Sequence, residues 1–315
     1  MYNVSIIIPH HNSPKKLKRL LDSVPNKDDI EVIVVDDRST KELDLFDEVK
    51  NEYLSKNINF FSNDRKNKGA GTCRNIGLEK AQGKWLLFAD ADDYFINDFY
   101  TKIKTYFNDN YDIVFFQPTS WDEHNNKISN RHETYANLVK LFIESNNDFY
   151  LRYQFVVPWS KLFRRDFVFY NSVKFDEVIA SNDIMFSIKT GYYAKRIQAS
   201  KETIYCVTKS KGTLTQNISL AVFRARLDAF IRNVEFLKSN LSKNEFQLMN
   251  YNGRGYLINT FKYKLGLKEF ISTFKKLRRH KIKFFDLKLV NPFFIIKKVV
   301  WHFKDVKNER DYKIK

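Results

Sequence analysis

Three carboxylates occur within four residues in the stretch Asp90-Ala91-Asp92-Asp93, directly after the apolar run 86–89. Carboxylates this close repel one another, and at the end of a buried strand a cation or hydrogen-bond donors must compensate them. Mg²⁺ and Mn²⁺ take oxygen ligands and commonly complete their coordination with substrate phosphates. The cluster predicts a site for Mn²⁺ or Mg²⁺ with Asp92 and Asp90 as ligands. The alternative is a solvated turn in which an aspartate caps a helix.

A second pair of carboxylates, Asp36 and Asp37, ends the apolar run 33–35. Acidic residues that follow strands accept hydrogen bonds from the nucleoside in other nucleotide-binding sheets. We therefore expect Asp37 to contact a nucleoside. The alternative is a helix start in which Ser39 or Thr40 caps the next helix.

A glycine-rich stretch, residues 67–77, supplies a third group of candidate residues. Its glycines allow close backbone approach at the start of a helix, and Arg74 would project from the first turns of that helix. A helix N-terminus beside a guanidinium suits a phosphate or diphosphate. The chain has no GxxxxGK[ST] motif, so a Walker-type phosphate loop is excluded.

The elements that must position these residues alternate along the first 120 residues. Short apolar runs rich in Val, Ile and Phe predict buried strands at 4–8, 30–35, 58–61, 85–88 and 113–116. Helices are predicted at 14–21 with Ser13 as N-cap, and at 41–54, 70–81, 97–107 and 183–194. This alternation predicts an α/β fold with a mainly parallel sheet flanked by helices. Ligands bind at the carboxyl ends of such strands, which is where the acidic residues and the triplet His10-His11-Asn12 fall.

Four stretches in this order and spacing resemble the family 2 glycosyltransferases of the GT-A fold. They are SIIIPHHN at 5–12, VVDDRST at 34–40, GAGTCRNIG at 69–77 and GKWLLFADADD at 83–93. Each stretch is moderately specific alone, but the ordered set is highly specific and covers residues 1–120. The resemblance implies a Rossmann-like GT-A sheet and an enzyme that inverts the anomeric carbon of a nucleotide sugar, with a UDP-sugar as the expected donor.

The resemblance continues more faintly to about residue 215. PWSKLFRR at 158–165 looks like the family's W-x-K-L-[YF]-[RK]-[RK] stretch, and FDE at 175–177 looks like its F-x-E. The family's Glu-Asp pair then corresponds to Asn182-Asp183, so asparagine replaces the glutamate. The resemblance implies that Asp183 is the catalytic base that deprotonates the acceptor hydroxyl.

The resemblance also implies a set of donor contacts around the predicted metal ligands. The residues assigned to nucleotide-sugar binding are Pro9, His11, Asn12, Asp37, Arg74, Asp90, Asp93, Trp159 and Lys161. His11 stands where the family usually has tyrosine, and its ring can still stack on a base. Adjacent residues at a strand end point in opposite directions, so His10 and His11 are not expected to bind one metal together.

Charge divides the chain into two parts. The first 220 residues hold 31 Lys/Arg and 29 Asp/Glu, whereas residues 221–315 hold 23 and 8. We expect a GT-A catalytic domain at 1–218, with a nucleotide-binding half at 1–120 and an acceptor-binding half at 121–218. A helical basic C-terminal region at 219–315 would follow.

Residues 271–303 interleave aromatic and basic side chains. This pattern predicts an element that lies on an anionic membrane surface. The alternative is a helical cap whose aromatics pack on the catalytic domain. Nucleic acid is not an expected partner, because no recognition motif accompanies the charge.

The remaining features bear on compartment and activity. Only two cysteines occur, no leader precedes the first strand, and no run of about 18 apolar residues is present. These features predict a cytoplasmic enzyme, at most peripheral on the inner face of the cell membrane. The expected reaction moves a sugar to a glycan or lipid-linked glycan, as in capsule, O-antigen or exopolysaccharide synthesis. Two alternatives are a sugar-nucleotide nucleotidyltransferase and a non-catalytic basic protein that binds nucleic acid or membranes.

Overall fold

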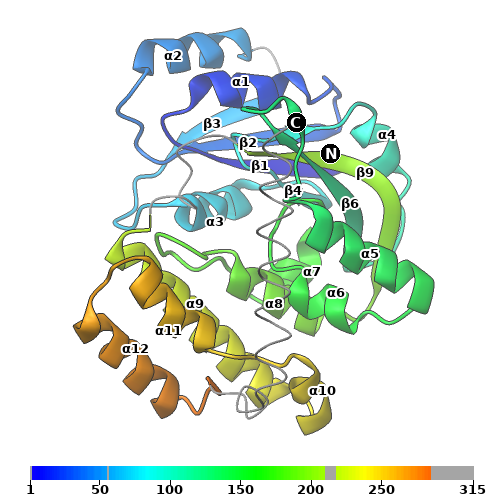
Figure 1. Ribbon diagram of the computed structural model, residues 1–315. Coiled ribbons are helices and arrows are strands. Elements are labelled where there is room, and N and C mark those ends of the chain that lie inside the picture. The colour runs from blue at the N-terminus through cyan, green and yellow to red at the C-terminus, as the bar shows by residue number, and fades with distance from the viewer. Residues whose placement is uncertain (1, 55–56, 210–217, 285–315) are drawn as a thin grey trace, which may run out of the picture. The chain divides into compact units, whose positions relative to one another are not determined.

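The computed structural model describes residues 2–54, 57–209 and 218–284 (Figure 1). The chain forms two compact units, Met1–Ala229 and Phe230–Lys315. All of the predicted site residues belong to the first unit.

Within the described residues the first unit holds a nine-stranded sheet in the order β3-β2-β1-β4-β8-β6-β9-β5, with β7 beside β6. The strands are β1 Val4–His10, β2 Ile30–Asp36, β3 Ile58–Ser62, β4 Trp85–Phe88, β5 Tyr94–Phe95, β6 Ile113–Asp122, β7 Lys127–Ile128, β8 Lys161–Arg164 and β9 Ile197–Lys209. The strands β3, β2, β1 and β4 are mutually parallel, and β9 is parallel to β6. Antiparallel β5, β7 and β8 make the sheet mixed. The predicted α/β class with a GT-A-like, mostly parallel sheet is confirmed.

The helices of the first unit cover both faces of this sheet. They are α1 Pro14–Asp22, α2 Leu43–Glu52, α3 Ala70–Lys80, α4 Phe99–Lys104, α5 Glu133–Ser145, α6 Phe149–Gln154, α7 Arg165–Tyr170 and α8 Ile184–Tyr193. Figure 1 shows α1 and α2 over one face of the parallel strands and α3 over the other. Every residue of β1 is buried, as expected for a parallel strand covered on both faces.

Helix starts near the site follow the predicted pattern only in part. Pro14 occupies the first turn of α1 with Ser13 at the N-cap, although the Ser13 hydroxyl makes no capping hydrogen bond. α2 begins at Leu43, so neither Ser39 nor Thr40 caps it. The hydroxyl of Ser39 instead donates to Asp36 at 2.5 Å. The sequence around Asp36 therefore forms a hydrogen-bonded loop between strand and helix.

β9 is the longest strand and was not separately predicted. It pairs with β6 from Ile197 to Lys209, and two of its residues, Tyr205 and Cys206, also pair with β5. Because β5 directly follows the acidic cluster, this pairing brings the end of β9 beside Asp93.

The second unit is helical in its described part. α9 Leu220–Asn240 crosses the boundary between the units and is followed by α10 Lys243–Leu248, α11 Arg254–Lys262 and α12 Leu267–Arg279. Leu237, Leu257 and Leu277 are buried. The prediction of helices from residue 220 onward is confirmed as far as residue 284, and 285–303 lies outside the described residues. No described helix is long and apolar enough to cross a bilayer.

Candidate active site

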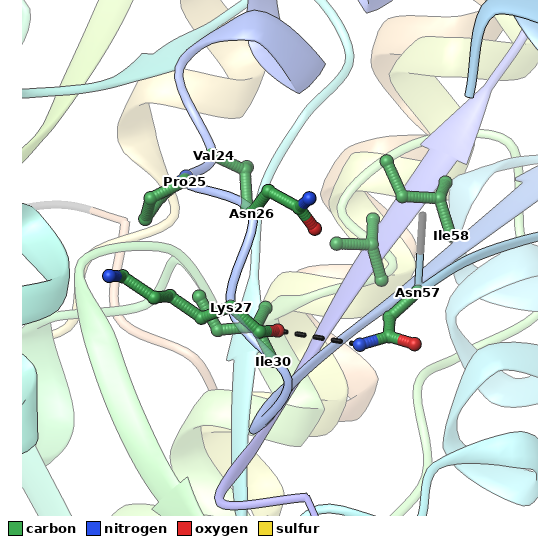
Figure 2. Close-up of a pocket in the computed structure, with 8 residues that line it drawn as sticks. Val24, Pro25, Asn26, Lys27, Ile30, Asn57 and Ile58 are labelled. Carbon is green, nitrogen blue, oxygen red and sulfur yellow. Dashed lines mark hydrogen bonds between the residues drawn. The ribbon is translucent and has the colours of Figure 1, made fainter. Parts of the chain in front are cut away.

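The carboxyl ends of β1, β2 and β4 meet at one edge of the sheet. His10 pairs in register with Asp36, and the end of β4, Phe88, pairs with Ile7. The acidic cluster begins two residues beyond Phe88. A small hollow lined by residues 24–27, Ile30 and Ile58 lies at the amino ends of β2 and β3 (Figure 2). It is therefore at the wrong end of the strands for ligand binding in this fold class.

His10 and Asp36 form a closed pair at the base of this edge. The His10 ring is buried, lies 2.8 Å from the Asp36 carboxylate through Nδ1 and stacks on Phe46 at 4.4 Å between centroids. Burial alone would raise the pKa of Asp36, but hydrogen bonds from His10 and Ser39 lower that pKa to about 2. The pair thus has a structural role.

The predicted donor contacts Pro9, His11 and Asn12 differ in their exposure and in their hydrogen bonds. Pro9 is buried inside β1, whereas His11 is exposed at the end of the strand. The side-chain oxygen Oδ1 of Asn12 accepts from the backbone amides of Thr40 and Lys41 at 2.8 and 2.9 Å. Asn12 therefore holds the loop after β2, and His11 is the member of this group that presents its ring to solvent.

Asp37 is buried and is held on both carboxylate oxygens. Oδ1 accepts from the side-chain amide of Asn63 at 2.6 Å, and Oδ2 accepts from the backbone N–H of Gly69 at 2.7 Å. A carboxylate offers about four lone-pair directions, so each oxygen can accept one further hydrogen bond. Asn63 follows β3 and was not among the predicted site residues.

The three aspartates of the acidic cluster occupy different environments. Asp93 is buried, and its two oxygens accept from the Tyr205 hydroxyl at 2.9 Å and the Thr208 backbone N–H at 2.7 Å. Burial raises the pKa of Asp93 well above its usual range, and Asp92 and Asp90 add to that rise. Asp93 is 2% exposed and ties the cluster to β9, and its predicted donor contact stays a prediction. Neither Tyr205 nor Thr208 was among the predicted site residues.

Asp90 and Asp92 remain partly exposed. The Asp90 side chain is 34% exposed and accepts from Arg74 on one oxygen. Among the described residues, no other residue donates to the Asp92 side chain, while its backbone oxygen accepts from Arg19 and Thr208. Burial raises the pKa of Asp92, and the charge of Asp90 raises it further. Two carboxylates that repel each other and retain free oxygens are suited to a shared cation.

The donor set fits Mn²⁺ or Mg²⁺ with part of the coordination supplied from outside the protein. Within the described ranges no three His, Cys, Asp or Glu side chains gather as a complete metal site. Both ions are commonly bound by one or two carboxylates together with substrate phosphates and water. Asp90 and Asp92 would thus hold a cation jointly with a diphosphate.

Arg74 connects the acidic cluster to the segment that carries Asp183. It is 4% exposed, donates from Nη2 to Asp90 and donates from Nη1 to the side-chain oxygen of Asn182 at 2.7 Å. Its guanidinium also lies over the Phe175 ring, 5.3 Å from the centroid. Arg74 therefore holds Asp90 and Asn182, and its predicted contact with the nucleotide sugar stays a prediction.

Asp183 occupies the N-cap position of α8 but makes no side-chain capping bond. Burial raises the pKa of its carboxyl, Arg74 and Lys161 oppose that rise, and Asp90 adds to it. Asp183 directly follows Asn182, which Arg74 links to Asp90, so the carboxyl group belongs to a segment tied to the acidic cluster. A raised pKa makes a carboxylate a better proton acceptor near neutral pH.

Trp159 and Lys161 pack beneath this region and are not exposed to it. The Trp159 ring stacks on Tyr205 with 5.8 Å between centroids. Lys161 is 1% exposed, donates to the Phe155 carbonyl at 2.6 Å and lies over the Phe155 and Phe115 rings. Burial lowers the pKa of Lys161 well below its usual value. Apolar packing encloses both side chains, and their predicted contacts with the nucleotide sugar stay predictions.

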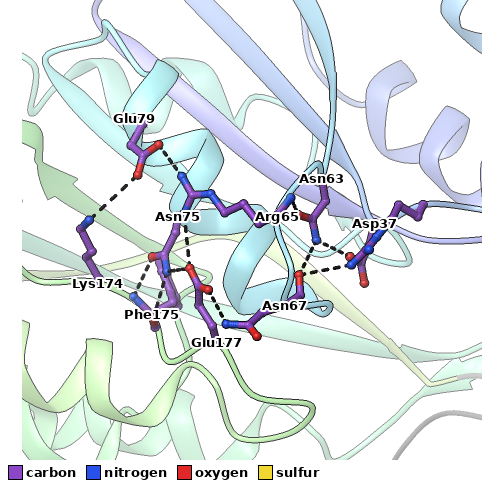
Figure 3. Close-up of polar contacts among 10 residues, drawn as sticks. Asp37, Asn63, Arg65, Asn67, Asn75, Glu79, Lys174, Phe175 and Glu177 are labelled. Atoms are coloured by element: carbon purple, nitrogen blue, oxygen red, sulfur yellow. Dashed lines mark hydrogen bonds and ion pairs between the residues drawn. The ribbon is translucent and has the colours of Figure 1, made fainter.

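A hydrogen-bond network ties the loop after β3 to the FDE stretch (Figure 3). The Glu177 carboxylate accepts from Arg65 at 3.3 Å, Asn67 at 2.9 Å and Asn75 at 3.2 Å. The hydrogen bond from Asn67 is the main reason that the pKa of Glu177 is lowered. Asn67 in turn accepts through its backbone oxygen from Asn63, which also donates to Asp37. Glu177 belongs to a recognised stretch, but its sequence gives no sign of these partners.

The first turn of α3 packs backbone to backbone against the same segment. A Cβ atom placed on Gly71 would lie 2.1 Å from the Asp176 carbonyl oxygen and 2.9 Å from the Cβ of Asn182. The Asp176 N–H donates to the Asn182 carbonyl at 3.0 Å. Only glycine allows α3 to approach the residues before Asp183 this closely.

Comparison with known proteins agrees with this geometry. The profile of Glycosyl transferase family 2 matches residues 5–170. The putative glycosyltransferase EpsH of Bacillus subtilis is 23% identical over 254 residues, which are 78% of this chain and 72% of EpsH. The poly(ribitol-phosphate) β-N-acetylglucosaminyltransferase TarS of Staphylococcus aureus is 27% identical over 220 residues, or 67% of this chain and 36% of TarS. The chain thus spans about a third of TarS.

Solved structures share the fold. Residues 1–349 of TarS, in complex with UDP-GlcNAc, superpose with a TM-score of 0.66 at 21% identity, covering 87% of this chain and 79% of that one. The mannosyltransferase PcManGT of Pyrobaculum calidifontis, in complex with GDP-Man and Mn²⁺, superposes with a TM-score of 0.53 at 14% identity, covering 88% and 75%. The profile match covers more than half of the chain and runs from Ser5 in β1 to beyond the end of β8. The chain belongs to glycosyl transferase family 2 and is a nucleotide-sugar-dependent glycosyltransferase.

Proposed function

We propose that this glycosyltransferase moves a sugar from a UDP-sugar to a glycan or lipid-linked glycan, with inversion, in the synthesis of a bacterial surface polysaccharide. One observation carries the proposal. Arg74 joins Asp90 of the acidic cluster to Asn182, so one guanidinium ties a candidate metal ligand to the residue that precedes the candidate base Asp183. The UDP-GlcNAc complex of TarS supports UDP as the nucleotide.

Asp90 and Asp92 would hold Mn²⁺ or Mg²⁺ together with the donor diphosphate. A cation there supplies Lewis-acid stabilisation of the charge that grows on the leaving diphosphate. The partly exposed carboxylates and their mutual repulsion support this assignment. The Mn²⁺ in the PcManGT structure supports it for the fold.

The nucleoside would lie over the carboxyl ends of β1 and β2. The exposed ring of His11 can stack on a uracil, and Asp37 keeps lone pairs for the base or ribose. Asn12 contributes by holding the loop after β2 through two backbone amides.

Asp183 would act as the general base. It takes the proton of the acceptor hydroxyl while that oxygen forms a bond to the anomeric carbon. The bond between the anomeric carbon and the diphosphate oxygen breaks on the opposite face, which inverts the configuration. Burial favours this role by raising the pKa of Asp183, and Arg74 keeps the carboxylate ionised enough to accept a proton.

A lipid-linked acceptor would place the enzyme on the cytoplasmic face of the cell membrane. The basic C-terminal region, including 271–303, supports this location through its charge. Of that range, residues 271–284 lie in the described part of the chain.

The test is UDP release from a panel of UDP-sugars in the presence of Mn²⁺ and candidate acceptors. Asp183→Asn should bind UDP as tightly as wild type and lose transfer by at least about a hundredfold. Asp166→Asn, an exposed aspartate in the first turn of α7, is the matched control and should transfer at the wild-type rate. No UDP release from any donor, or full activity in Asp183→Asn, would overturn the proposal.

A further inference from the structure

The helices α11 and α12 expose four large apolar side chains. Ile258 and Phe261 on α11 are 55% and 63% exposed, and Leu267 and Ile271 on α12 are 67% and 43% exposed. The second unit contributes only residues 230–284 to the described chain, yet it holds a large share of the exposed apolar side chains. A surface of this kind marks a site of interaction with a partner or a membrane.

The two helices form one compact hairpin. The rings of Phe261 and Phe270 lie 5.0 Å apart, and the Leu265 N–H donates to the Thr260 carbonyl at 2.8 Å. Residues three or four apart on a helix share a face, so Ile258 with Phe261 and Leu267 with Ile271 each form an exposed stripe. Leu257 and Leu277 are buried, so the hairpin has an inner and an outer side.

Basic residues surround the exposed stripes. Residues 254–279 contain eight Lys/Arg and a single acidic residue, Glu269, which is buried. Lys262, Lys264 and Lys268 are exposed at the connection itself. The hairpin therefore combines apolar side chains at its tip with a strong positive charge beside them.

This combination decides between possible partners. A second copy of the chain would bring the same positive charge against itself, which is unfavourable. Nucleic acid would be attracted by the lysines but would leave the aliphatic side chains exposed, since phosphate contacts do not bury them. An anionic bilayer satisfies both features, because apolar side chains enter the acyl boundary while lysines reach lipid phosphates.

We propose that the α11–α12 hairpin, residues 254–279, docks on an anionic membrane surface. Ile258, Phe261, Leu267 and Ile271 enter the boundary between headgroups and acyl chains, and Lys262, Lys264 and Lys268 bind lipid phosphates. This inference makes specific the membrane partner in the proposed function. It requires no assumption about the sugar or the acceptor.

The test is flotation of the full chain with vesicles of phosphatidylcholine alone or with about 30 mol% phosphatidylglycerol. Wild type should bind the anionic vesicles and remain free of the neutral ones. The variant Ile258→Ser/Phe261→Ser/Leu267→Ser/Ile271→Ser should bind at least about tenfold more weakly, since each buried apolar side chain adds to membrane affinity. Lys262→Glu/Lys264→Glu/Lys268→Glu should bind at least about a hundredfold more weakly, because each of the three lysines near an anionic surface adds about fivefold.

Matched controls separate docking from folding and from catalysis. Lys243→Glu/Leu248→Ser changes an exposed lysine and an exposed leucine of α10 and should bind vesicles as wild type does. The catalytic variant Asp183→Asn should also bind normally, so failure of the transfer reaction would leave this result intact. Wild-type vesicle binding by both hairpin variants would overturn the proposal. So would a dimer in solution that the serine variant abolishes while wild type ignores lipid.

Discussion

Arg74 donates to the side-chain oxygen of Asn182 at 2.7 Å, so a residue of α3 holds the residue that immediately precedes Asp183. The same guanidinium is paired with Asp90. Family 2 resemblance places a glutamate at position 182, where this chain has a neutral asparagine. The charge next to Asp183 is therefore one unit less negative than the family pattern implies.

Restoring that glutamate should change the pH dependence of transfer. In Asn182→Glu a second carboxylate beside Asp183 disfavours its ionised form and raises its pKa further. The acidic limb of the kcat profile should then move to higher pH by about half a unit to one unit. Asn182→Gln, which has the same length without the charge, should leave the limb in place. An unmoved limb in Asn182→Glu would show that position 182 does not set the pKa of the base.

Removal of the Asp92 carboxylate and removal of the Asp93 carboxylate should have different effects on the free energy of unfolding. Asp93→Ala leaves the Tyr205 hydroxyl and the Thr208 N–H without their acceptor, which should cost about 2–4 kcal/mol of unfolding free energy. Asp92→Ala removes a carboxylate that repels Asp90, so stability should be unchanged or slightly higher. Urea unfolding of both variants measures the difference. Equal losses would contradict the separate roles assigned to them.

Asp92 should instead govern metal-dependent nucleotide binding. Calorimetry with UDP should show tighter binding by wild type in Mn²⁺ than in EDTA. In Asp92→Asn the increase in UDP affinity caused by Mn²⁺ should be at least about tenfold smaller, because one of the two protein ligands of the metal is lost. Asp47→Asn, an exposed aspartate of α2, serves as the control and should keep the full gain. A full Mn²⁺ effect in Asp92→Asn would remove this residue from the metal site.

The pairing of His10 with Asp36 predicts a loss of stability in acid. The pKa of Asp36 is lowered to about 2 in the folded protein, whereas an unfolded aspartate titrates near its usual value of about 3.9. Its contribution is complete above about pH 4, amounts to roughly 2 kcal/mol, and disappears as the pH falls towards 2. Asp36→Asn should therefore be less stable than wild type at about pH 6, and the difference in free energy of unfolding between the two proteins should be smaller at about pH 3. A constant gap in urea unfolding at the two pH values would contradict this.

Because Lys161 is buried, we expect the free energy of unfolding to rise at alkaline pH. Burial lowers its pKa, so the folded protein loses this proton at a pH where the unfolded chain, with a lysine pKa of about 10.4, still holds it. Stability should rise with pH over the window from the lowered pKa to about 10.4. Lys161→Met should lack this rise, whereas Lys174→Met, which changes an exposed lysine, should retain it. Chemical unfolding at about pH 7 and about pH 9.5 provides the measurement.

Much of the fold of residues 1–120 followed from the alternation of apolar runs and helical stretches. The strands β1, β2 and β4 are buried on both faces, so their local sequence carries the signal, whereas β3 is only partly buried. The residues after these strands, among them Asp37, Asp90 and Asp92, were correctly placed at one edge, because the edge is set by strand direction. The helices from 220 to 284 also followed from local periodicity.

The partners of the site residues could not be predicted, because they come from distant segments. Asp93 meets Tyr205 only because β9 pairs with β5, and Asp37 meets Asn63 only because β2 pairs with β3. Lys161 was predicted to contact the nucleotide sugar, yet its side chain packs against the Phe115 and Phe155 rings. Spacing along a sequence indicates which residues reach an edge, but tertiary packing determines which of them remain available there.

The absence of a side chain at Gly71 has a consequence for building hybrid enzymes. The start of α3 contacts the residues before Asp183 through bare backbone, and a methyl group would meet the Asp176 carbonyl at 2.1 Å. A segment 175–183 transplanted from a relative must therefore reproduce this backbone path, whatever its side chains. Segment exchanges meant to alter the acceptor should therefore transfer α3 and residues 175–183 together. Hybrids that take these two segments from different proteins should fold incorrectly.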